Sequence, residues 1–462
     1  MTVVYFTALA LLTLSAYVLA SRRSVALSST GVRLHSLPAY HGLLAISLVI
    51  VPMLLIWAVG TPLVSQFAAS NALTNFPAET RNDALQAGSA LREIKNLAAG
   101  QRSGDVSDTL RAAADTYSAW RTTGDYLLLS IGLAAALLGI AASLRLVSGP
   151  FRARNHFESV VRVILLACAG VAVLTTIGIV ASVLTETIRF FFDPNIKGRP
   201  GVFDFLFGTE WNPQQAMRAD QGDIKSAYGF VPLLTGTLLI TAIAMCVAGP
   251  LGLLSAIYLA EYASPRMRRY AKPVLEILAG VPTVVLGFFA ALTVAPYIRG
   301  WGEALGLDVA SESALAAGLV MGMMIIPFIS SLSDDVMNAV PQSLRDGAYA
   351  LGATKSEAIK QVVLPAALPG IVSAFMLAMS RAIGETMIVV MAAGLAANLT
   401  LNPLDAVTTI TVQIKTILVG DQEFDSAKTL AAFALGFVLF FITLILNIIA
   451  LRIVRKYREQ YD

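Results

Sequence analysis

The sequence has little charge for its length. Of its 462 residues only 14% are Asp, Glu, Lys or Arg, whereas 56% are hydrophobic. A soluble protein usually carries about 25% charged residues, so this chain has too few to cover a soluble surface of its size. The shortage excludes a soluble enzyme and a disordered regulator, and the net charge of +3 gives no general attraction to nucleic acid. The composition predicts an integral membrane protein.

Cysteine and histidine are also scarce. Cys168 and Cys246 lie inside apolar runs, which predicts two small buried hydrophobic side chains and no disulfide. His35, His41 and His156 have no Cys, Asp or Glu at ligand spacing, so no metal site is predicted. We expect no catalytic residues, metal or cofactor in this chain.

Long hydrophobic runs, in contrast, are abundant. A membrane span needs about 20 apolar residues, and nine stretches qualify, which predicts an all-α membrane protein. Two of them, 229–260 and 366–395, are long enough to tilt, bend or contain a break. The nine predicted spans lie near 2–20, 42–64, 126–147, 159–183, 229–260, 273–297, 314–333, 366–395 and 427–451.

Basic residues fall on alternate connections between these spans. Under the positive-inside rule this pattern predicts an N-terminus outside the cell and a C-terminus in the cytoplasm. The basic clusters are Arg22, Arg23 and Arg33; Arg145, Arg152 and Arg154; Arg266, Arg268, Arg269 and Lys272; Arg345, Lys355 and Lys360; and Arg452, Arg455, Lys456 and Arg458.

The polar segment 66–124 lies outside the membrane on this assignment. Apolar residues recur in it at helical spacing on both sides of a break at Gly100–Gly104, which predicts an external hairpin of two amphipathic helices. The hairpin is either a spacer held by its flanking spans or a docking surface for a partner. The apolar residues are Leu85, Leu91, Ile94 and Leu97, then Leu110, Ala114, Tyr117 and Trp120.

The cytoplasmic connection 341–365 is unusually long and regular. Pro341 can start a helix, Gly352 can end it, and Pro365 can break the chain before the next span. These signals predict a short helix, a turn at glycine and a second short helix, a shape that can dock into a groove on a partner. Gly347 and Gly352 also have the separation found in a phosphate-binding loop, but Ala353 stands where that loop needs lysine, so nucleotide binding is excluded.

The eighth predicted span contains opposite charges. Arg381 and Glu385 are four residues apart, which places them on one face of a continuous helix, with the hydroxyl of Thr386 nearby. An arginine in mid-membrane costs at least about 2.5–3.5 kcal/mol, so it needs a reason to be there. Either the two form a structural ion pair, or Arg381 faces a water-filled pathway and binds an oxyanion that Glu385 helps to release.

The cytoplasmic connection resembles the EAA loop of ABC-importer permeases, whose pattern is EAA, three residues, Gly, nine residues, Ile, one residue, Leu-Pro. All intervals match, although Asp replaces Glu, Gly replaces the first Ala and Val replaces Ile. The resemblance implies a coupling helix that sits in a cleft of a separate ATPase subunit. The matching residues are Asp346, Gly347, Ala348, Gly352, Val362, Leu364 and Pro365.

The stretch from Arg381 to Thr386 is similar to the RAxGET signature of phosphate ABC-transporter permeases of the Pst type. Outside the membrane, Glu210–Pro213 and Tyr228–Leu233 resemble segments of the PstC-type permease, one of the two permeases of that system. Glu261–Pro265 and Ala279–Val285 are similar to that family too. The resemblance covers about residues 157–460.

This resemblance implies a six-span type I ABC-importer permease core at 157–462, with its coupling loop at 341–365. Residues 1–156, with three spans and the external hairpin, form an N-terminal extension outside the usual family pattern. The implied partners are a second permease, a cytoplasmic ATPase dimer that carries ATP and Mg²⁺, and an extracytoplasmic phosphate-binding protein. The expected place is the bacterial inner membrane.

Three other functions remain open. The chain can be a permease for another oxyanion or the second phosphate permease. It can be a secondary transporter driven by an ion gradient, since buried charges also occur there. It can also be a sensor that uses the outer hairpin.

Overall fold

The structure is a computed structural model that describes residues 1–77, 81, 83–100, 107–196, 198–213, 228–419 and 426–458. These residues are almost entirely helical, with one isolated antiparallel bridge between Trp211 and Tyr228. Among them, nine helices are long and apolar enough to cross a membrane, in agreement with the nine predicted stretches. They span Thr2–Ser29, Pro38–Leu73, Asp108–Leu146, Ala153–Phe192, Val231–Tyr262, Thr283–Ala304, Ala314–Ala339, Lys355–Ile383 and Ala427–Ile453.

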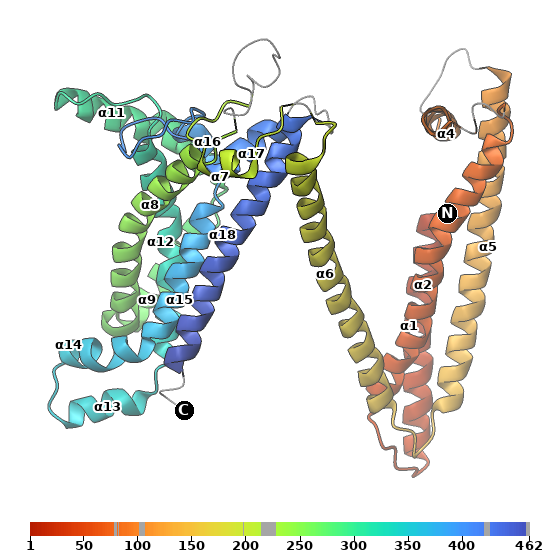
Figure 1. The fold of residues 1–462 in the computed structure, drawn as a ribbon. Helices are drawn as coiled ribbons and strands as arrows, with labels where there is room; N and C mark the ends of the chain where they lie inside the picture. The colour runs from red at the N-terminus through yellow and green to blue at the C-terminus, as the bar shows by residue number, and fades with distance from the viewer. Residues whose placement is uncertain are drawn as a thin grey trace. The chain divides into compact units, whose positions relative to one another are not determined.

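The chain divides into two compact units, Met1–Leu174 and Thr175–Asp462, and the division falls inside helix α6. The predicted domain boundary at 156/157 stays a prediction. The first unit is a bundle of three long helices with a shorter one beside them (Figure 1). Its helices are α1 (Thr2–Ser29), α2 (Pro38–Leu73), α4 (Ala84–Ala98), α5 (Asp108–Leu146) and the beginning of α6 (Ala153–Phe192).

Small residues let the helices of the first unit approach closely. Ala16 and Ala20 of α1, Ala45 of α2 and Ala136 of α5 are fully buried in one cluster. A side chain at Gly139 of α5 would collide with the backbone of α2 at Leu48. Small residues at helix contacts are typical of membrane proteins, where close van der Waals packing replaces the hydrophobic effect.

Both helices of the predicted hairpin are present. The first is the separate helix α4, and the second is the beginning of the long helix α5. α4 packs on the end of α2 and the start of α5 through Ile94, Ala72, Leu110 and Ala113. The second predicted hairpin helix and the third span form one continuous helix, α5, which begins after the N-cap Ser107. The side chain of Ser107 accepts a hydrogen bond from the backbone N–H of Leu110. The break residues 101–104 lie outside the described residues.

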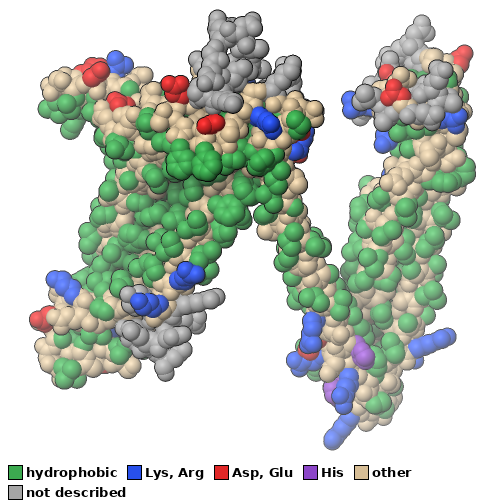
Figure 2. All heavy atoms as spheres, viewed as in Figure 1, with side chains coloured by type: hydrophobic (Ala, Val, Ile, Leu, Met, Phe, Trp, Pro, Cys, Tyr) green, Lys and Arg blue, Asp and Glu red, His purple; other side chains and the backbone are tan. Residues whose placement is uncertain are grey.

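The two connections of the first unit that carry basic residues lie together. The backbone N–H of His35 donates to the carbonyl of Gly149, and that of Arg154 donates to the hydroxyl of Ser36. In each unit, charged side chains gather near the ends of the helices and the flanks between them are apolar (Figure 2). This distribution matches a membrane-spanning body with polar ends.

The second unit contains the remaining helices. Its spans alternate with short helices at their ends (Figure 1). The elements are α7 (Val202–Phe207), α8 (Val231–Ile257), η3 (Tyr258–Tyr262), α9 (Pro265–Ala279), α10 (Thr283–Phe289), η4 (Ala290–Val294), α11 (Ala295–Ala304), α12 (Ala314–Ala339), α13 (Gln342–Ala350), α14 (Lys355–Ala358), η5 (Ile359–Val363), α15 (Leu364–Ile383), α16 (Met387–Ala392), α17 (Ile410–Leu418) and α18 (Ala427–Arg458), where η marks a π-helical turn.

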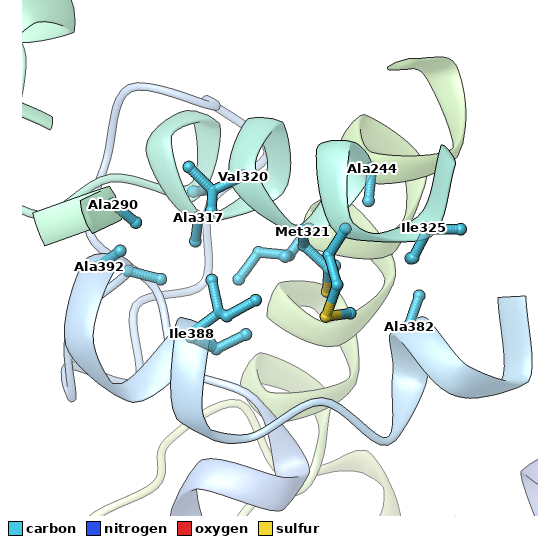
Figure 3. Packing of buried hydrophobic residues seen from close by; sticks show 14 of the residues in the cluster. Ala244, Ala290, Ala317, Val320, Met321, Ile325, Ala382, Ile388 and Ala392 are labelled. Carbon is cyan, nitrogen blue, oxygen red and sulfur yellow. The ribbon is translucent and has the colours of Figure 1, made fainter. Parts of the chain in front are cut away.

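Helix α12 lies at the centre of this unit. Its residues Ala317, Met321 and Ile325 are fully buried, and they pack against α8, α15, α16 and η4 (Figure 3). Ala244 of α8 and Ala382 of α15 bring those helices close to α12. The core places one face of α15 against α12 and leaves another face of α15 uncovered.

Two sequence expectations differ from the structure. The sixth span begins at Thr283, and the apolar residues of α9 belong to a separate amphipathic helix that ends at Ala279. Cys168 and Cys246 are free, as predicted, but exposed. An apolar side chain on a span need not be covered by its own chain, because lipid or a partner can cover it.

Candidate functional site

Arg381 lies on a face of α15 that the chain leaves uncovered. The buried face of this helix consists mainly of Ala374, Ala378 and Ala382. Leu377, four residues before Arg381, is 45% exposed, and Arg381 is exposed as well. The guanidinium carbon of Arg381 lies 6.0 Å from the centre of the Phe328 ring of α12. The cation therefore rests beside an aromatic ring with its donors free of any acidic group among the described residues.

The predicted pairing of Arg381 with Glu385 on one helical face is wrong. α15 ends at Ile383, and Glu385 lies in the break before α16. One oxygen of the Glu385 carboxylate accepts hydrogen bonds from the backbone N–H groups of Met387 (3.0 Å) and Ile388 (3.3 Å). Glu385 thus serves the first turn of α16, where backbone donors have no partner within the helix. Of the three alternatives for 366–395, a tilt, a bend or a break, the structure has the break.

The break is held on its other side by α17. The hydroxyl of Thr411 donates to the backbone carbonyl of Glu385 over 2.9 Å. The hydroxyl of Thr386 lies 3.5 Å from the carbonyl of Gly384, at the limit of a hydrogen bond. The structure therefore brings Arg381, Glu385 and Thr386 to the same end of α15, with Glu385 engaged in backbone contacts.

The connection 341–365 forms the predicted short helix and turn. α13 begins after Pro341, and Gly352 ends it with φ of +86°, a left-handed conformation that favours glycine. The N–H of Gly352 donates to the carbonyl of Tyr349, and the N–H of Ala353 donates to that of Ala348. These two bonds form a Schellman motif, which satisfies carbonyls at the end of a helix.

A capping box follows the glycine directly. The Thr354 hydroxyl accepts from the N–H of Glu357, and the Glu357 carboxylate accepts from the N–H of Thr354 over 2.8 Å. The expected break at Pro365 is wrong, because α14, η5 and α15 form a continuous helix from Lys355 to Ile383. Proline is tolerated there because it occupies the first turn of α15 after a π-helical turn.

The predicted coupling residues divide by exposure. Asp346 and Gly347 are exposed, and nothing lies within 4 Å of a Cβ placed at Gly347 or at Gly352. Ala348 is buried, and Leu364 packs on a cluster around Val363 at the base of the loop. Val362 is half-buried and Pro365 is exposed. The structure therefore places Asp346 and the two glycines outward, and Ala348 and Leu364 toward the protein.

A buried ion pair that the sequence analysis missed lies behind α13. The side chain of Arg345 is 10% exposed and that of its partner Glu261 only 8%. Two nitrogens of Arg345 donate to Oε1 of Glu261 over 3.2 and 3.0 Å. Arg345 also donates to the backbone carbonyls of Val340 (2.6 Å) and Met337 (2.7 Å). The pair is 84 residues apart in the sequence, so no local spacing signals it.

A second buried carboxylate joins α9 to α12. Asp334 of α12 is 1% exposed and accepts from Arg268 (2.9 Å) and Lys272 (3.0 Å) of α9. Asn338 donates to the same carboxylate over 2.9 Å. The hydrogen bond to Asp335 raises the pKa of Lys272, and Asp334 raises it further. The basic cluster that follows the fifth span is thus partly neutralised by α12.

The external segment that carries the PstC resemblance is anchored to α17. The indole N–H of Trp211 donates to the side-chain carbonyl of Gln413 over 3.0 Å. The Trp211 ring lies edge-on to Tyr228, with centroids 6.0 Å apart. The amide nitrogen of Gln413 donates in turn to the carbonyl of Leu395 and to Thr408. These residues hold the α16–α17 connection in place.

A bundle of spans with an exposed arginine on an uncovered face of α15 and a short helical loop at one end is typical of a membrane permease. Comparisons with known proteins identify the family of this chain. Residues 248–459 match the family described as "Binding-protein-dependent transport system inner membrane component", and residues 6–175 match one described as "Phosphate ATP-binding cassette transporter". The N-terminal extension therefore matches a transporter family of its own, where the sequence analysis found no family pattern.

Curated relatives agree with these matches. The chain is 32% identical over 278 residues to the probable ABC transporter permease protein YqgH of Bacillus subtilis, covering 60% of this chain and 84% of that protein. It is 34% identical to the phosphate transport system permease protein PstC 1 of Mycobacterium tuberculosis, covering 54% of this chain and 81% of that one. The inward-facing MetNI methionine ABC transporter is similar in structure, at 21% identity and a TM-score of 0.36 over 50% of this chain and 94% of that one. The chain belongs to the PstC-type phosphate permease family of ABC importers.

Proposed function

We propose that this permease subunit of a phosphate ABC importer passes inorganic phosphate along the uncovered face of α15, with Arg381 as the group that binds the oxyanion. The exposed position of Arg381 on a span carries this proposal. A charged side chain on a membrane span is unfavourable against lipid, so this face is expected to border a partner or a water-filled pathway. A planar cation with several donors suits a tetrahedral oxyanion.

We propose that Glu385 has a structural role and is not the counter-charge of Arg381. Its carboxylate is occupied by the backbone N–H groups of α16, so it does not neutralise Arg381 between transport events. We propose that Glu385 instead fixes the break that follows Arg381, and that Thr386 offers a further hydroxyl at the same end of the helix. Release of phosphate then depends on movement of the spans, which changes what surrounds Arg381.

We also propose that α13 docks on a cytoplasmic ATPase subunit. Its outer side presents Leu344, Tyr349 and Leu351, and Leu351 is 90% exposed. A group of exposed apolar side chains at a polar end of a membrane protein is typical of a contact surface. Gly347 lies on the exposed side of the same helix, where the absence of a side chain permits close approach.

The proposed assembly consists of this chain, a second permease, two ATPase subunits that carry ATP and Mg²⁺, and an extracytoplasmic phosphate-binding protein. The chain is a multi-pass protein of the inner membrane. We propose that its N-terminus lies outside and its C-terminus in the cytoplasm. This orientation is supported by the basic residues on alternate connections between the spans, which the positive-inside rule places in the cytoplasm. ATP binding would close the ATPase dimer and open the pathway outward, and hydrolysis would reopen it inward.

Phosphate uptake at low external phosphate tests the site. Arg381→Gln is expected to lower uptake at least tenfold with normal membrane levels and an intact complex, and Arg381→Lys is expected to retain part of it. Arg299→Gln is the matched control, because Arg299 is an exposed arginine of the same unit that pairs with Glu303 on its own helix. Unchanged uptake in Arg381→Gln would show that Arg381 does not bind the substrate.

A further inference from the structure

Arg345 is the one residue of α13 that reaches two spans at once. Its backbone belongs to α13, whose nearest helical neighbours are α14 and η5. Its side chain extends to Glu261 in η3, the continuation of α8, and to the carbonyls of Met337 and Val340 at the end of α12. One guanidinium group therefore joins the short helix to α8 and to the central helix α12.

The groups that accept hydrogen bonds from Arg345 favour a positively charged donor. Met337 and Val340 lie at the C-terminal end of α12, where the helix dipole favours positive charge. The carbonyl of Met337 accepts both from Arg345 and from the backbone N–H of Val340. Glu261 supplies a carboxylate that is itself almost completely buried. A lysine has the charge but not the planar set of donors, so it cannot make all of these bonds together.

Apart from Arg345, the side chains of α13 contribute little buried contact with the rest of the unit. Only Arg345 and Ala348 of this helix are buried, and Ala348 has only a methyl group to contribute. The other end of α13 leads through the turn at Gly352 into α14 and α15. Movement of α13 can thus reach α12 and α15 through the chain itself, at Val340–Pro341 and at the turn at Gly352, whereas the hydrogen bonds of Arg345 connect it to η3 and α8.

We propose that Arg345 and Glu261 are a positioning pair that makes α13, η3 with α8, and the end of α12 move as one body when the ATPase closes. The inference rests on the proposed docking of α13 on the ATPase. The pair touches neither phosphate nor nucleotide, so its effect is on the coupling between ATP hydrolysis and transport. Without it, the ATPase still binds and hydrolyses ATP while less of its movement reaches the pathway.

The test uses the complete complex reconstituted in lipid vesicles. For Arg345→Gln, Glu261→Gln, the double variant and wild type, we would measure copurified ATPase, the rate of ATP hydrolysis and the phosphate transported per ATP. Arg269→Gln is the control, because Arg269 is exposed at the same end of the unit. Both single variants are expected to keep the ATPase bound and to lower phosphate per ATP at least fivefold. The double variant is expected to be no worse than Arg345→Gln, since both changes remove one interaction.

A wild-type ratio of phosphate to ATP in both Arg345→Gln and Glu261→Gln would overturn the proposal. If Arg345→Gln does not assemble, Glu261→Gln decides alone, because glutamine keeps the volume and an acceptor oxygen. Loss of stability without a change in this ratio would mean that the pair is only structural. Failure of the proposed function would look different, because the wild-type chain would then not copurify with an ATPase or would transport no phosphate.

Discussion

Two substitutions of Glu385 distinguish its two possible roles, as an acceptor for the first turn of α16 or as a counter-charge for Arg381. Glu385→Gln keeps an oxygen that can accept from Met387 and Ile388, so we expect phosphate uptake within about threefold of wild type. Glu385→Ala removes the acceptor and is expected to cost about 1 kcal/mol of stability, the usual value of a lost cap. Uptake assays together with thermal unfolding in detergent check both expectations. If Glu385→Gln lost uptake as completely as Arg381→Gln, a charge-based role for Glu385 would be restored.

Gly352 and Gly347 differ in what the chain requires of them. Gly352→Ala places a Cβ on a residue with φ of +86°, which costs about 1 kcal/mol. Gly347→Ala lies within an exposed helix and is expected to stabilise α13 by up to about 1 kcal/mol. Unfolding of the purified chain checks the opposite signs. Two changes of the same sign would contradict the turn described here.

At the scale of the element, α13 offers a test of docking that leaves the fold intact. Gly347→Leu has open space around it in this chain, so normal folding and membrane levels are expected. If the ATPase approaches this face closely, the added side chain will prevent its binding, and copurified ATPase will fall at least tenfold. Ser356→Leu in α14, also exposed, serves as the control. Full ATPase binding by the Gly347→Leu variant would place the contact elsewhere.

In the contact between α9 and α12, we expect removal of the two cations to cost more stability than removal of the carboxylate. Asp334 is buried, whereas Arg268 and Lys272 are 35% and 28% exposed, so only the acid depends on its partners for charge compensation. Replacing both cations by methionine leaves a buried carboxylate uncompensated, and we expect a loss of about 3 kcal/mol. Asp334→Asn leaves two cations that can turn to water, and it should cost clearly less. Denaturant unfolding of the two variants compares them, and equal losses would argue against this account.

The sequence was sufficient for elements that local signals specify. Hydrophobic length predicts the number of spans and the place of eight, with the sixth displaced toward α9, and Pro341 and Gly352 predict the ends of α13 correctly. It was insufficient where a helix changes course inside an apolar run. Arg381 and Glu385 were placed on one continuous face because Gly384 alone is a weak breaker, although a glutamate followed by Thr386 was a usable sign of a new helix start.

Long-range pairs could not be predicted for a different reason. Arg345 and Glu261 belong to separate helices, and their meeting depends on how α8, α12 and α13 pack. Both were visible only as charges beside spans. Pro365 shows the converse, because a strong helix breaker is accommodated when a π-helical turn precedes it.

On the scale of the whole molecule, α4, the first helix of the external hairpin, is separable from the spans. Among the described residues, α4 packs on the end of α2 and the start of α5, whereas the core of the first unit lies around Ala45 and Ala136. Replacing residues 75–106 with a short Gly-Ser linker is therefore expected to leave membrane levels and phosphate uptake within about twofold of wild type. Uptake and any phosphate-dependent gene response would be measured in the same cells. Loss of the response alone would favour the sensor, and loss of uptake would contradict the expectation.

The uncovered face of α15 also bears on how a cell keeps its subunits in balance. A chain that finds no partner leaves the guanidinium of Arg381 against lipid, and an isolated charge of this kind lowers the stability of a span in the bilayer. In cells, proteins of low stability are continuously removed by proteases. The residue that we propose to bind phosphate would thus also mark unassembled copies for removal, so that the amount of this permease follows the supply of its partner.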